Sequence, residues 1–356
     1  MKTSISKVLK LLCLVLLFQN CTSDDRDIEI QTLEGDYVNG LFVLNEGGYT
    51  YSNASVSFID GSGTVYNNIF YGVNQMELGD VAQSMAFYND QAYIVLNYSN
   101  TIQVVNRYTF EHIATIDEQI LNPRYMVFND GKGYATNWGD PADATDDYIA
   151  VIDLETNTVE NRIAVSEGPE RILLYNNTIY VAHKGGWGYG NSLSVIKDET
   201  VTDTIELAYV PNGMQVSGNY LYVLCSGKAD WTGDETLAKI FKVNMDTNQV
   251  EETLEFSSGQ HPNFTEIADN KLYYVLDRDI FSIDLSAFEL PSEALFSTLP
   301  QDVQVLYGFR VYNNKIYVAD AKDYVSNGSV FIYDMQGNLQ QDYQVQIIPN
   351  GFYFND

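Results

Sequence analysis

The sequence contains 356 residues, of which 48 are Asp or Glu and only 19 are Lys or Arg, so its formal net charge is −29 at pH 7. This charge argues against nucleic acid and anionic membrane surfaces as partners, because both repel an acidic protein. The acidic charge alone does not identify a ligand, because solubility and mutual repulsion on a crowded cell surface are sufficient to explain it.

The first twenty residues have the pattern of a secretory signal. Lys2, Lys7 and Lys10 lie before and near the start of an apolar run over residues 8–18, which is too short to cross a bilayer as a permanent helix. Cys21 follows at the position where a lipoprotein signal is cleaved and its cysteine acylated, and Phe18-Gln19-Asn20 is a loose match to the small residues preferred there. The alternative is an ordinary cleaved signal followed by a chance cysteine.

Residues 21–36 are interpreted as an acidic flexible tether. The run Thr22-Ser23-Asp24-Asp25 resembles the surface-export signal that follows the lipidated cysteine in Bacteroidota lipoproteins. We therefore expect a lipid anchor at Cys21, no transmembrane helix, and a location in the outer membrane facing the cell exterior. Removal of residues 1–20 would shift the formal charge from −29 to −32. Cys225 would then be the only free thiol, so no disulfide framework is possible.

Residues 37–356 contain repeated units of four short predicted strands. In each unit, a loop that often carries proline leads into an apolar strand, an Asn/Asp/Gly turn and a second strand centred on tyrosine. The central tyrosines are 41, 46, 42, 51 and 44 residues apart, and they are Tyr93, Tyr134, Tyr180, Tyr222, Tyr273 and Tyr317. Repeats of this length with four strands predict the blades of a β-propeller.

The two ends of this region predict how the ring closes. Residues 348–356 repeat the start of a unit and stop at its turn, and residues 40–44 continue that unit. The C-terminal segment should therefore supply the innermost strand of the first blade, which gives six complete units plus one split unit. We predict an all-β, seven-bladed propeller as a single domain. A β-sandwich would lack self-similar units, and a solenoid would need capping repeats.

The loops between second and third strands are the first candidate for a binding site. In a propeller they open on the same face as the loops that lead into the first strands, around the central channel. All three tryptophans lie in these loops, where a rigid aromatic face suits a flat or apolar ligand. The alternative is that each tryptophan packs on its own loop. The candidate aromatic residues are Trp138, Trp187, Trp231, Tyr49, Tyr51, Tyr98, Tyr189 and Tyr324.

Polar residues near the starts of the first strands extend the candidate site. Three arginines at related positions, in so acidic a protein, suit a ligand carboxylate, amide or phosphate oxygen. Equally, they could bridge neighbouring blades by binding loop carbonyls and acids. The polar candidates are Arg124, Arg171, Arg310, Asn212 and His261, together with His183 from a loop between second and third strands.

Catalytic and metal-binding patterns are sparse. His183 and His261 lie in rim loops of different blades, and two histidines make no metal site without a third ligand. Asp140, Asp143, Asp146 and Asp147 offer oxygen ligands of the kind calcium favours, but without the EF-hand order, so a solvated acidic loop is the preferred interpretation. We expect no metal, no cofactor and no catalysis. A lactonase or lyase on this scaffold is the enzyme alternative, and a protein-binding adaptor is another.

The signal, the stretch Gly40-Leu41-Phe42-Val43-Leu44-Asn45-Glu46-Gly47-Gly48 and the proline-led repeats resemble the YncE-like propeller lipoproteins of Bacteroidota, most closely the BtuG type. That resemblance implies surface capture of cobalamin or another corrinoid and its delivery to a TonB-dependent outer-membrane transporter. Cobalamin would be a transported ligand rather than a cofactor. A siderophore, haem or glycan is the alternative ligand within the same class.

Overall fold

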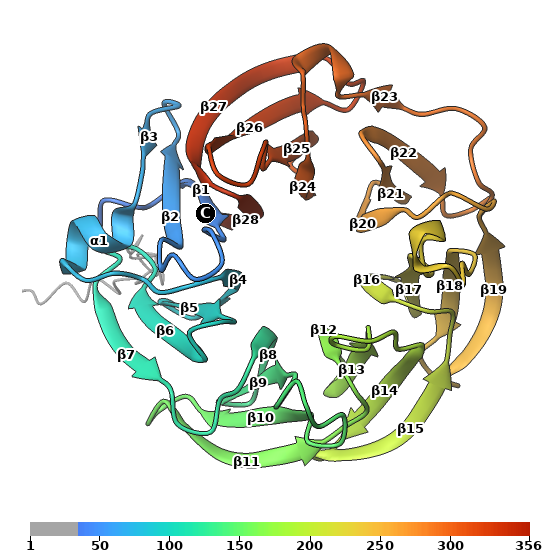
Figure 1. The fold of residues 1–356 in the computed structure, drawn as a ribbon, viewed down its shortest axis with the longest axis horizontal. Coiled ribbons are helices and arrows are strands. Elements are labelled where there is room, and N and C mark those ends of the chain that lie inside the picture. Colours follow the sequence, from blue (N-terminus) through green and yellow to red (C-terminus); the bar gives the residue numbers. More distant parts are fainter. Residues whose placement is uncertain (1–34) are drawn as a thin grey trace, which may run out of the picture. The chain divides into compact units, whose positions relative to one another are not determined.

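The computed structural model describes residues 35–356, which form seven four-stranded antiparallel sheets arranged as the blades of a propeller (Figure 1). This confirms the predicted fold. The signal, Cys21 and most of the expected tether lie outside the described residues. Within the described residues, no helix is long and apolar enough to cross a membrane.

Six blades use four consecutive strands each, and blade 1 combines β1, β2 and β3 with β28. Blades 1 to 3 consist of β1 (Gly40–Asn45), β2 (Ser55–Asp60), β3 (Val65–Tyr66), β28 (Pro349–Asn355), β4 (Ala82–Tyr88), β5 (Gln91–Leu96), β6 (Thr101–Asn106), β7 (His112–Ile116), β8 (Pro123–Asn129), β9 (Lys132–Asn137), β10 (Tyr148–Asp153) and β11 (Thr158–Ala164). Blades 4 and 5 consist of β12 (Pro169–Tyr175), β13 (Thr178–His183), β14 (Ser192–Lys197), β15 (Thr200–Glu206), β16 (Pro211–Ser217), β17 (Tyr220–Cys225), β18 (Lys239–Asn244) and β19 (Gln249–Glu255). Blades 6 and 7 consist of β20 (Asn263–Ala268), β21 (Lys271–Leu276), β22 (Asp279–Asp284), β23 (Phe296–Ser297), β24 (Leu306–Tyr312), β25 (Lys315–Asp320), β26 (Asn327–Asp334) and β27 (Leu339–Ile347).

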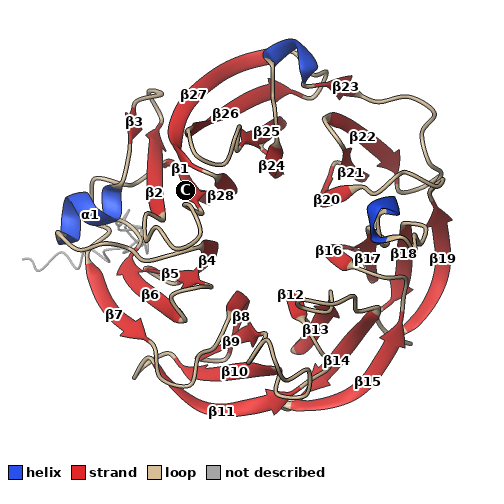
Figure 2. Ribbon diagram, in the orientation of Figure 1, coloured by secondary structure: helices blue, strands red, loops and turns tan. Residues whose placement is uncertain are grey.

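Helix is nearly absent from the described residues, as predicted (Figure 2). One short α-helix, α1 (Ile69–Asn74), connects blade 1 to blade 2, and two single 3₁₀ turns, η1 (Asp230–Thr232) and η2 (Leu299–Gln301), lie in loops. The positions of the site are therefore set by strands and by the loops between them.

The C-terminal strand closes the ring in the predicted way. β28 pairs antiparallel with β1, with Phe352 opposite Val43 and Phe354 opposite Leu41. β28 thereby becomes the innermost strand of blade 1, and the two ends of the domain lie in one sheet. An edge left open at β1 would expose a row of unpaired N–H and C=O groups, which this pairing removes.

The core lies between blades. Each of the seven hydrophobic clusters joins residues from two neighbouring blades. The second-strand tyrosines belong to these interfaces, since all six are at most 7% exposed. In five of the six cases the preceding turn contains Asn or Asp with positive φ, such as Asn176 (47°) and Asn313 (46°), which explains the choice of these residues. Before Tyr222, the residue with positive φ is Gly218 (58°). The second-strand tyrosines are therefore core residues.

Candidate ligand-binding face

The innermost strands share an irregularity at the same place. Near the start of each one, the pairing with the second strand shifts register, so that extra residues stand opposite a single partner. Such β-bulges redirect side chains and are frequent beside active sites. The residue immediately after the first paired position is, in blade order, Asn350, Gln83, Arg124, Glu170, Asn212, Phe264 and Tyr307. We call these seven residues the bulge ring; six of them are polar.

The backbone just before these strands is also unusual. The residue that precedes the innermost strand has positive φ in five blades, and in three of them it is β-branched: Val81 (56°), Val210 (60°) and Ile348 (55°). This region is unfavourable for β-branched residues and is typical of functional sites. Each of these three carbonyls accepts a backbone hydrogen bond from the residue that follows the second strand, for example Ser226 N to Val210 O at 2.9 Å.

These hydrogen bonds fix which loops share a face. The same contact links Trp138 N to Asn122 O at 3.1 Å and Lys184 N to Gly168 O at 2.9 Å. Loops between second and third strands therefore meet the loops that lead into the first strands, as predicted. We call this the loop face.

Aromatic side chains are exposed mainly on the loop face. Among residues 35–356, nine Tyr and Trp side chains are exposed, and seven of them lie in loops between second and third strands. The two others, Tyr66 and Tyr71, lie on β3 and α1. The seven, which we call the aromatic rim, are Tyr49, Tyr51, Tyr98, Trp187, Tyr189, Trp231 and Tyr324. All seven are among the residues that the sequence singles out.

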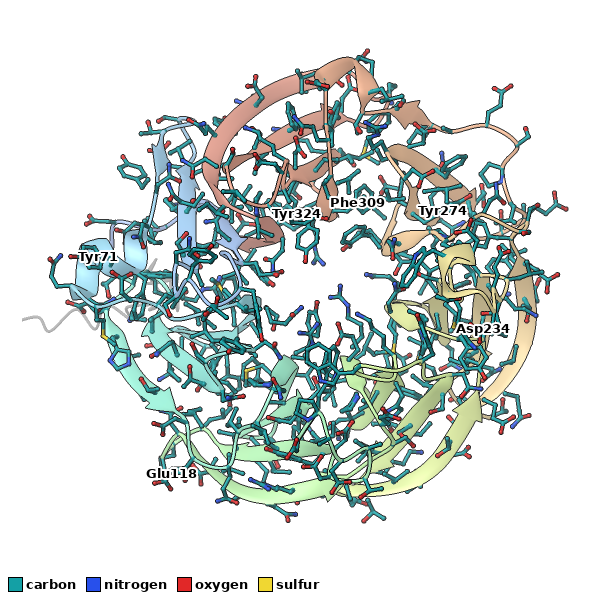
Figure 3. All side chains as sticks on the ribbon, in the orientation of Figure 1. Tyr71, Glu118, Asp234, Tyr274, Phe309 and Tyr324 are labelled. Atoms are coloured by element: carbon teal, nitrogen blue, oxygen red, sulfur yellow. The ribbon has the colours of Figure 1, made fainter. Side chains whose placement is uncertain are left out.

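Several rim residues form pairs. The rings of Tyr49 and Tyr98, from blades 1 and 2, are 4.5 Å apart. Tyr324 packs edge-on against Tyr307 of the bulge ring at 5.7 Å. In Figure 3, Tyr324 and Phe309 lie at the inner edge of the ring of blades, whereas Glu118 lies at the outer edge. Trp187 and Trp231 are 67% and 80% exposed, which makes them the most accessible indoles for a ligand.

Trp138 behaves differently from the other two tryptophans. It is 8% exposed, and its indole N–H donates to the Pro169 carbonyl at 3.1 Å. Its ring covers the Arg124 guanidinium at 4.1 Å and contacts Trp187 edge-on at 5.9 Å. Trp138 therefore packs against the neighbouring blade 4 and supports the exposed Trp187.

Arg124 is paired with a carboxylate of the neighbouring blade. Its Nε and Nη2 donate to the two carboxylate oxygens of Glu170 at 2.8 and 3.0 Å, and the pair joins blades 3 and 4. Burial by itself would raise the pKa of Glu170, but Arg124 and Lys184 outweigh it and lower that pKa to about 2. Burial opposes the charged form of Arg124 too, yet Glu170 raises its pKa. Arg124 therefore bridges blades 3 and 4. This is the second of the two roles that the sequence left open for the arginines, the first being to bind a ligand.

Glu46 lies next to this pair. Its oxygens are 3.5 Å from the Tyr307 hydroxyl and 3.4 Å from Asn350 Nδ2. Burial raises the pKa of Glu46, although Tyr307, Arg124, Asn350 and Lys184 oppose the shift. Glu46 and Tyr307 are absent from the candidates drawn from the sequence. Tyr307 lies in the bulge of β24, which depends on strand register and is therefore not visible in the sequence.

Below the bulge ring, the innermost strands enclose a cavity of about 190 Å³. Its lining comes from all seven blades and includes Gln83, Tyr125, Arg171, Gln215, Glu266, Arg310 and Tyr353 together with apolar side chains such as Met85, Met214, Phe264, Phe309 and Phe352. Two predicted site residues, Arg171 and Arg310, therefore meet in one cavity, although they come from different blades. Asn212 lines it as well.

The two cavity arginines have different partners. Arg310 Nη1 is 3.1 Å from Glu266 Oε1, which joins blades 7 and 6. The Arg171 guanidinium stacks on Tyr125 at 4.1 Å, and its Nε donates to the Asn212 carbonyl at 3.1 Å. Burial raises the pKa of Glu266 to about 7, although Arg310 and Arg171 oppose that shift.

The two candidate histidines are held by neighbours away from the cavity. His183 is buried, its Nε2 is 2.8 Å from Ser194 Oγ, and burial lowers its pKa to about 4. His261 is half-buried, with Nδ1 2.8 Å from the Ser226 carbonyl and Nε2 3.4 Å from Glu235. Neither residue lines the central cavity.

The acidic loop of blade 3 uses its carboxylates to bind its own backbone. Asp146 accepts from Asp140 N, Asp143 accepts from Thr145 N at 2.9 Å, and Asp147 accepts from Gly168 N. Burial raises the pKa of Asp147 to about 6. Across residues 35–356, no group of three His, Cys, Asp or Glu residues has the arrangement of a metal site.

Comparison with solved structures identifies other propellers of low sequence identity. A quinonprotein alcohol dehydrogenase-like protein from Bacteroides thetaiotaomicron is 15% identical, with a TM-score of 0.63 over 90% of this chain and 79% of that one. Dihydro-heme d1 dehydrogenase NirN in complex with DHE is 12% identical, with a TM-score of 0.55 over 91% and 76%. BamB from Moraxella catarrhalis is 14% identical, with a TM-score of 0.52 over 92% and 88%.

At this level of identity, the similarity establishes the fold alone. No curated protein matches the chain. The model of a domain of unknown function, DUF5074, matches residues 39–346, and the chain belongs to this DUF5074 family.

Proposed function

We propose that the protein is a binding protein that captures a large ligand on its loop face. The observation that carries this proposal is the aromatic rim, because seven of nine exposed Tyr and Trp residues gather in equivalent loops. Exposed aromatic residues on one face mark an interaction surface, and their rigid rings gain contact area at little entropic cost. The bulge ring places polar groups next to the rim.

The ligand we propose is a corrinoid such as cobalamin. The cavity of about 190 Å³ lies below the size range of ordinary ligand pockets, so a corrinoid would lie across the rim rather than inside the ring. The rings of Trp187 and Trp231 suit its flat macrocycle, and nearby amide and guanidinium groups suit its amides and phosphate. The resemblance to BtuG-type lipoproteins supports the same ligand, and the similar fold of NirN was solved in complex with DHE.

The proposal extends to location and delivery. A lipid anchor at Cys21 would hold the propeller on the outer membrane, and a TonB-dependent transporter would receive the ligand. Expression in a bacterial host with radiolabelled palmitate tests the anchor, because Cys21→Ala should abolish labelling of the mature protein. Labelling that persists in Cys21→Ala would show that Cys21 is not the acylated residue.

Gel filtration of the purified protein with excess cobalamin tests the ligand assignment. Cobalamin absorbs visible light, so a complex should carry colour at the elution volume of the protein. Haemin serves as a second flat ligand and shows whether the rim selects a corrinoid. Colour that elutes only with free cobalamin would contradict the assignment. A protein-binding adaptor that uses the same rim would also fail to bind cobalamin. The loop face would then be tested for binding to another protein.

A further inference from the structure

The central cavity has a cation with unused binding capacity. Arg171 donates only through Nε, to the Asn212 carbonyl, and its guanidinium is stacked on Tyr125. Among residues 35–356, no carboxylate forms an ion pair with Arg171, and its two Nη nitrogens make no hydrogen bond to the protein. A guanidinium presents donors in a fixed fork that fits a carboxylate. The cavity therefore offers a carboxylate a preformed partner.

The same cavity has an acid with unused binding capacity. Glu266 receives one hydrogen bond, from Arg310 to Oε1, and within the described chain its Oε2 makes none. Arg171, Arg310 and Glu266 line the same cavity, so the three groups share one environment. A buried carboxylate without a full set of partners is costly, and an ammonium group would neutralise it.

The remaining polar groups and the size of the cavity restrict the ligand further. Gln83 and Gln215 donate through Nε2 to Tyr125 and to the Thr265 carbonyl, at 2.9 and 2.8 Å, which leaves both side-chain oxygens as acceptors. A volume of about 190 Å³ corresponds to roughly six water molecules. Met85 and Met214 add apolar wall, which suits a short aliphatic group.

From this arrangement we infer that the cavity binds a small α-amino acid, with its carboxylate on Arg171 and its ammonium group on Glu266. This site is separate from the aromatic rim and goes beyond the corrinoid proposal. Arg310 would hold Glu266 in position, and the glutamine oxygens would accept from the ammonium group. Glycine, alanine and serine are within the size limit.

Isothermal titration of the purified protein with glycine, L-alanine and L-serine tests the site. Propionate lacks the ammonium group and ethylamine lacks the carboxylate, so both should bind about tenfold more weakly or not at all. Because the pKa of Glu266 is raised to about 7, binding at pH 7 should release protons, and the measured heat should depend on the buffer's ionisation enthalpy. Absence of binding by all three amino acids, or equal binding of propionate, would overturn the inference.

Two variants assign the contacts. Arg171→Met should weaken amino-acid binding about tenfold or more, whereas Arg162→Met is the matched control, because Arg162 stacks on Tyr148 at 4.3 Å on an outer strand. Glu266→Gln should weaken amino-acid binding and remove the proton release. Unchanged affinity in Arg171→Met would overturn the inference. The double variant Trp187→Ala with Trp231→Ala should leave amino-acid binding intact. Failure of the rim proposal can therefore be distinguished from failure of the cavity proposal.

Discussion

At the scale of single residues, the Arg124–Glu170 pair shows how the inner end of a blade interface is held. Both side chains are at most 10% exposed and joined by two hydrogen bonds. Glu170→Gln would leave a buried guanidinium without its counter-ion, which should lower the free energy of unfolding by about 3–5 kcal/mol. Urea unfolding monitored by fluorescence measures this loss.

Two further variants separate charge from packing at this pair. Replacing both partners, Arg124→Met with Glu170→Leu, should cost clearly less than Glu170→Gln, because no buried guanidinium is left without its counter-ion. Glu252→Gln removes the partner of Lys242 on the surface and should cost about 0–1 kcal/mol. Equal losses in Glu170→Gln and Glu252→Gln would show that burial does not strengthen the inner pair.

Glu266 predicts a pH dependence of stability. Its pKa in the folded protein is about 7, above the ordinary value of 4.5, so its stabilising contribution is complete below pH 4.5 and disappears as the pH rises through 7. Glu266→Gln removes this titration. The difference in free energy of unfolding, variant minus parent, should therefore increase by about 3 kcal/mol between pH 4.5 and pH 8.

Denaturation at several pH values measures that difference directly. Asp147 and His183 also have shifted pKa values, but they are present in both proteins and cancel in the comparison. A difference that stays constant between pH 4.5 and pH 8 would contradict the assigned pKa of Glu266.

Individual site residues were only partly predictable from sequence. The exposed rim aromatics could be identified because unequal loops after the tyrosine strands are visible in the repeat. Trp138 could not be separated from Trp187, since burial under a neighbouring loop depends on three-dimensional contacts. Glu46, Tyr307 and Glu266 were missed for the same reason: bulges and contacts between blades bring them to the ring centre.

At the scale of elements, β28 is the strand that completes the ring. Its Phe352 is 5% exposed and packs against Tyr317 of blade 7, with ring centroids 5.8 Å apart. Phe352→Ala should therefore lower the free energy of unfolding by about 3–5 kcal/mol. Chemical denaturation measures the loss, and Tyr51→Ala, at a loop aromatic that is 77% exposed, is the control with an expected effect below about 0.5 kcal/mol.

Truncation before Pro349 tests the strand as a whole. The loss of β28 would expose the edge of β1, which should cause self-association detectable by light scattering. A truncated protein that stays monomeric and unfolds at the same urea concentration as the parent would contradict the role of β28 in closure.

Elements were the most predictable level of this protein. The tyrosine-centred strands, their Asn/Asp turns and the split first blade follow from local periodicity, which needs no knowledge of distant contacts. The bulges are not visible in the same way, because a bulge depends on the register between two strands. Residues such as Val210 and Ile348, with positive φ before the innermost strands, also run against sequence preference.

At the scale of the whole molecule, the seven blades have two kinds of surface: faces buried between blades and the exposed loop face. Their buried faces form seven similar interfaces, whereas the loop face is unequal from blade to blade and contains seven of the nine exposed Tyr and Trp side chains. Membership in the DUF5074 family and the similarity to other propellers establish the scaffold. Function must therefore be argued from the loop face and the cavity beneath it.

The affinity for cobalamin, compared between the parent protein and Trp187→Ala with Trp231→Ala, tests the central claim most directly. Tyr66→Ala with Tyr71→Ala is the matched control, because these exposed aromatics lie on β3 and α1. Equilibrium titration should show a loss of affinity of about tenfold or more in the tryptophan variant and none in the control. Equal affinity of the parent and the tryptophan variant would contradict a ligand site on the aromatic rim.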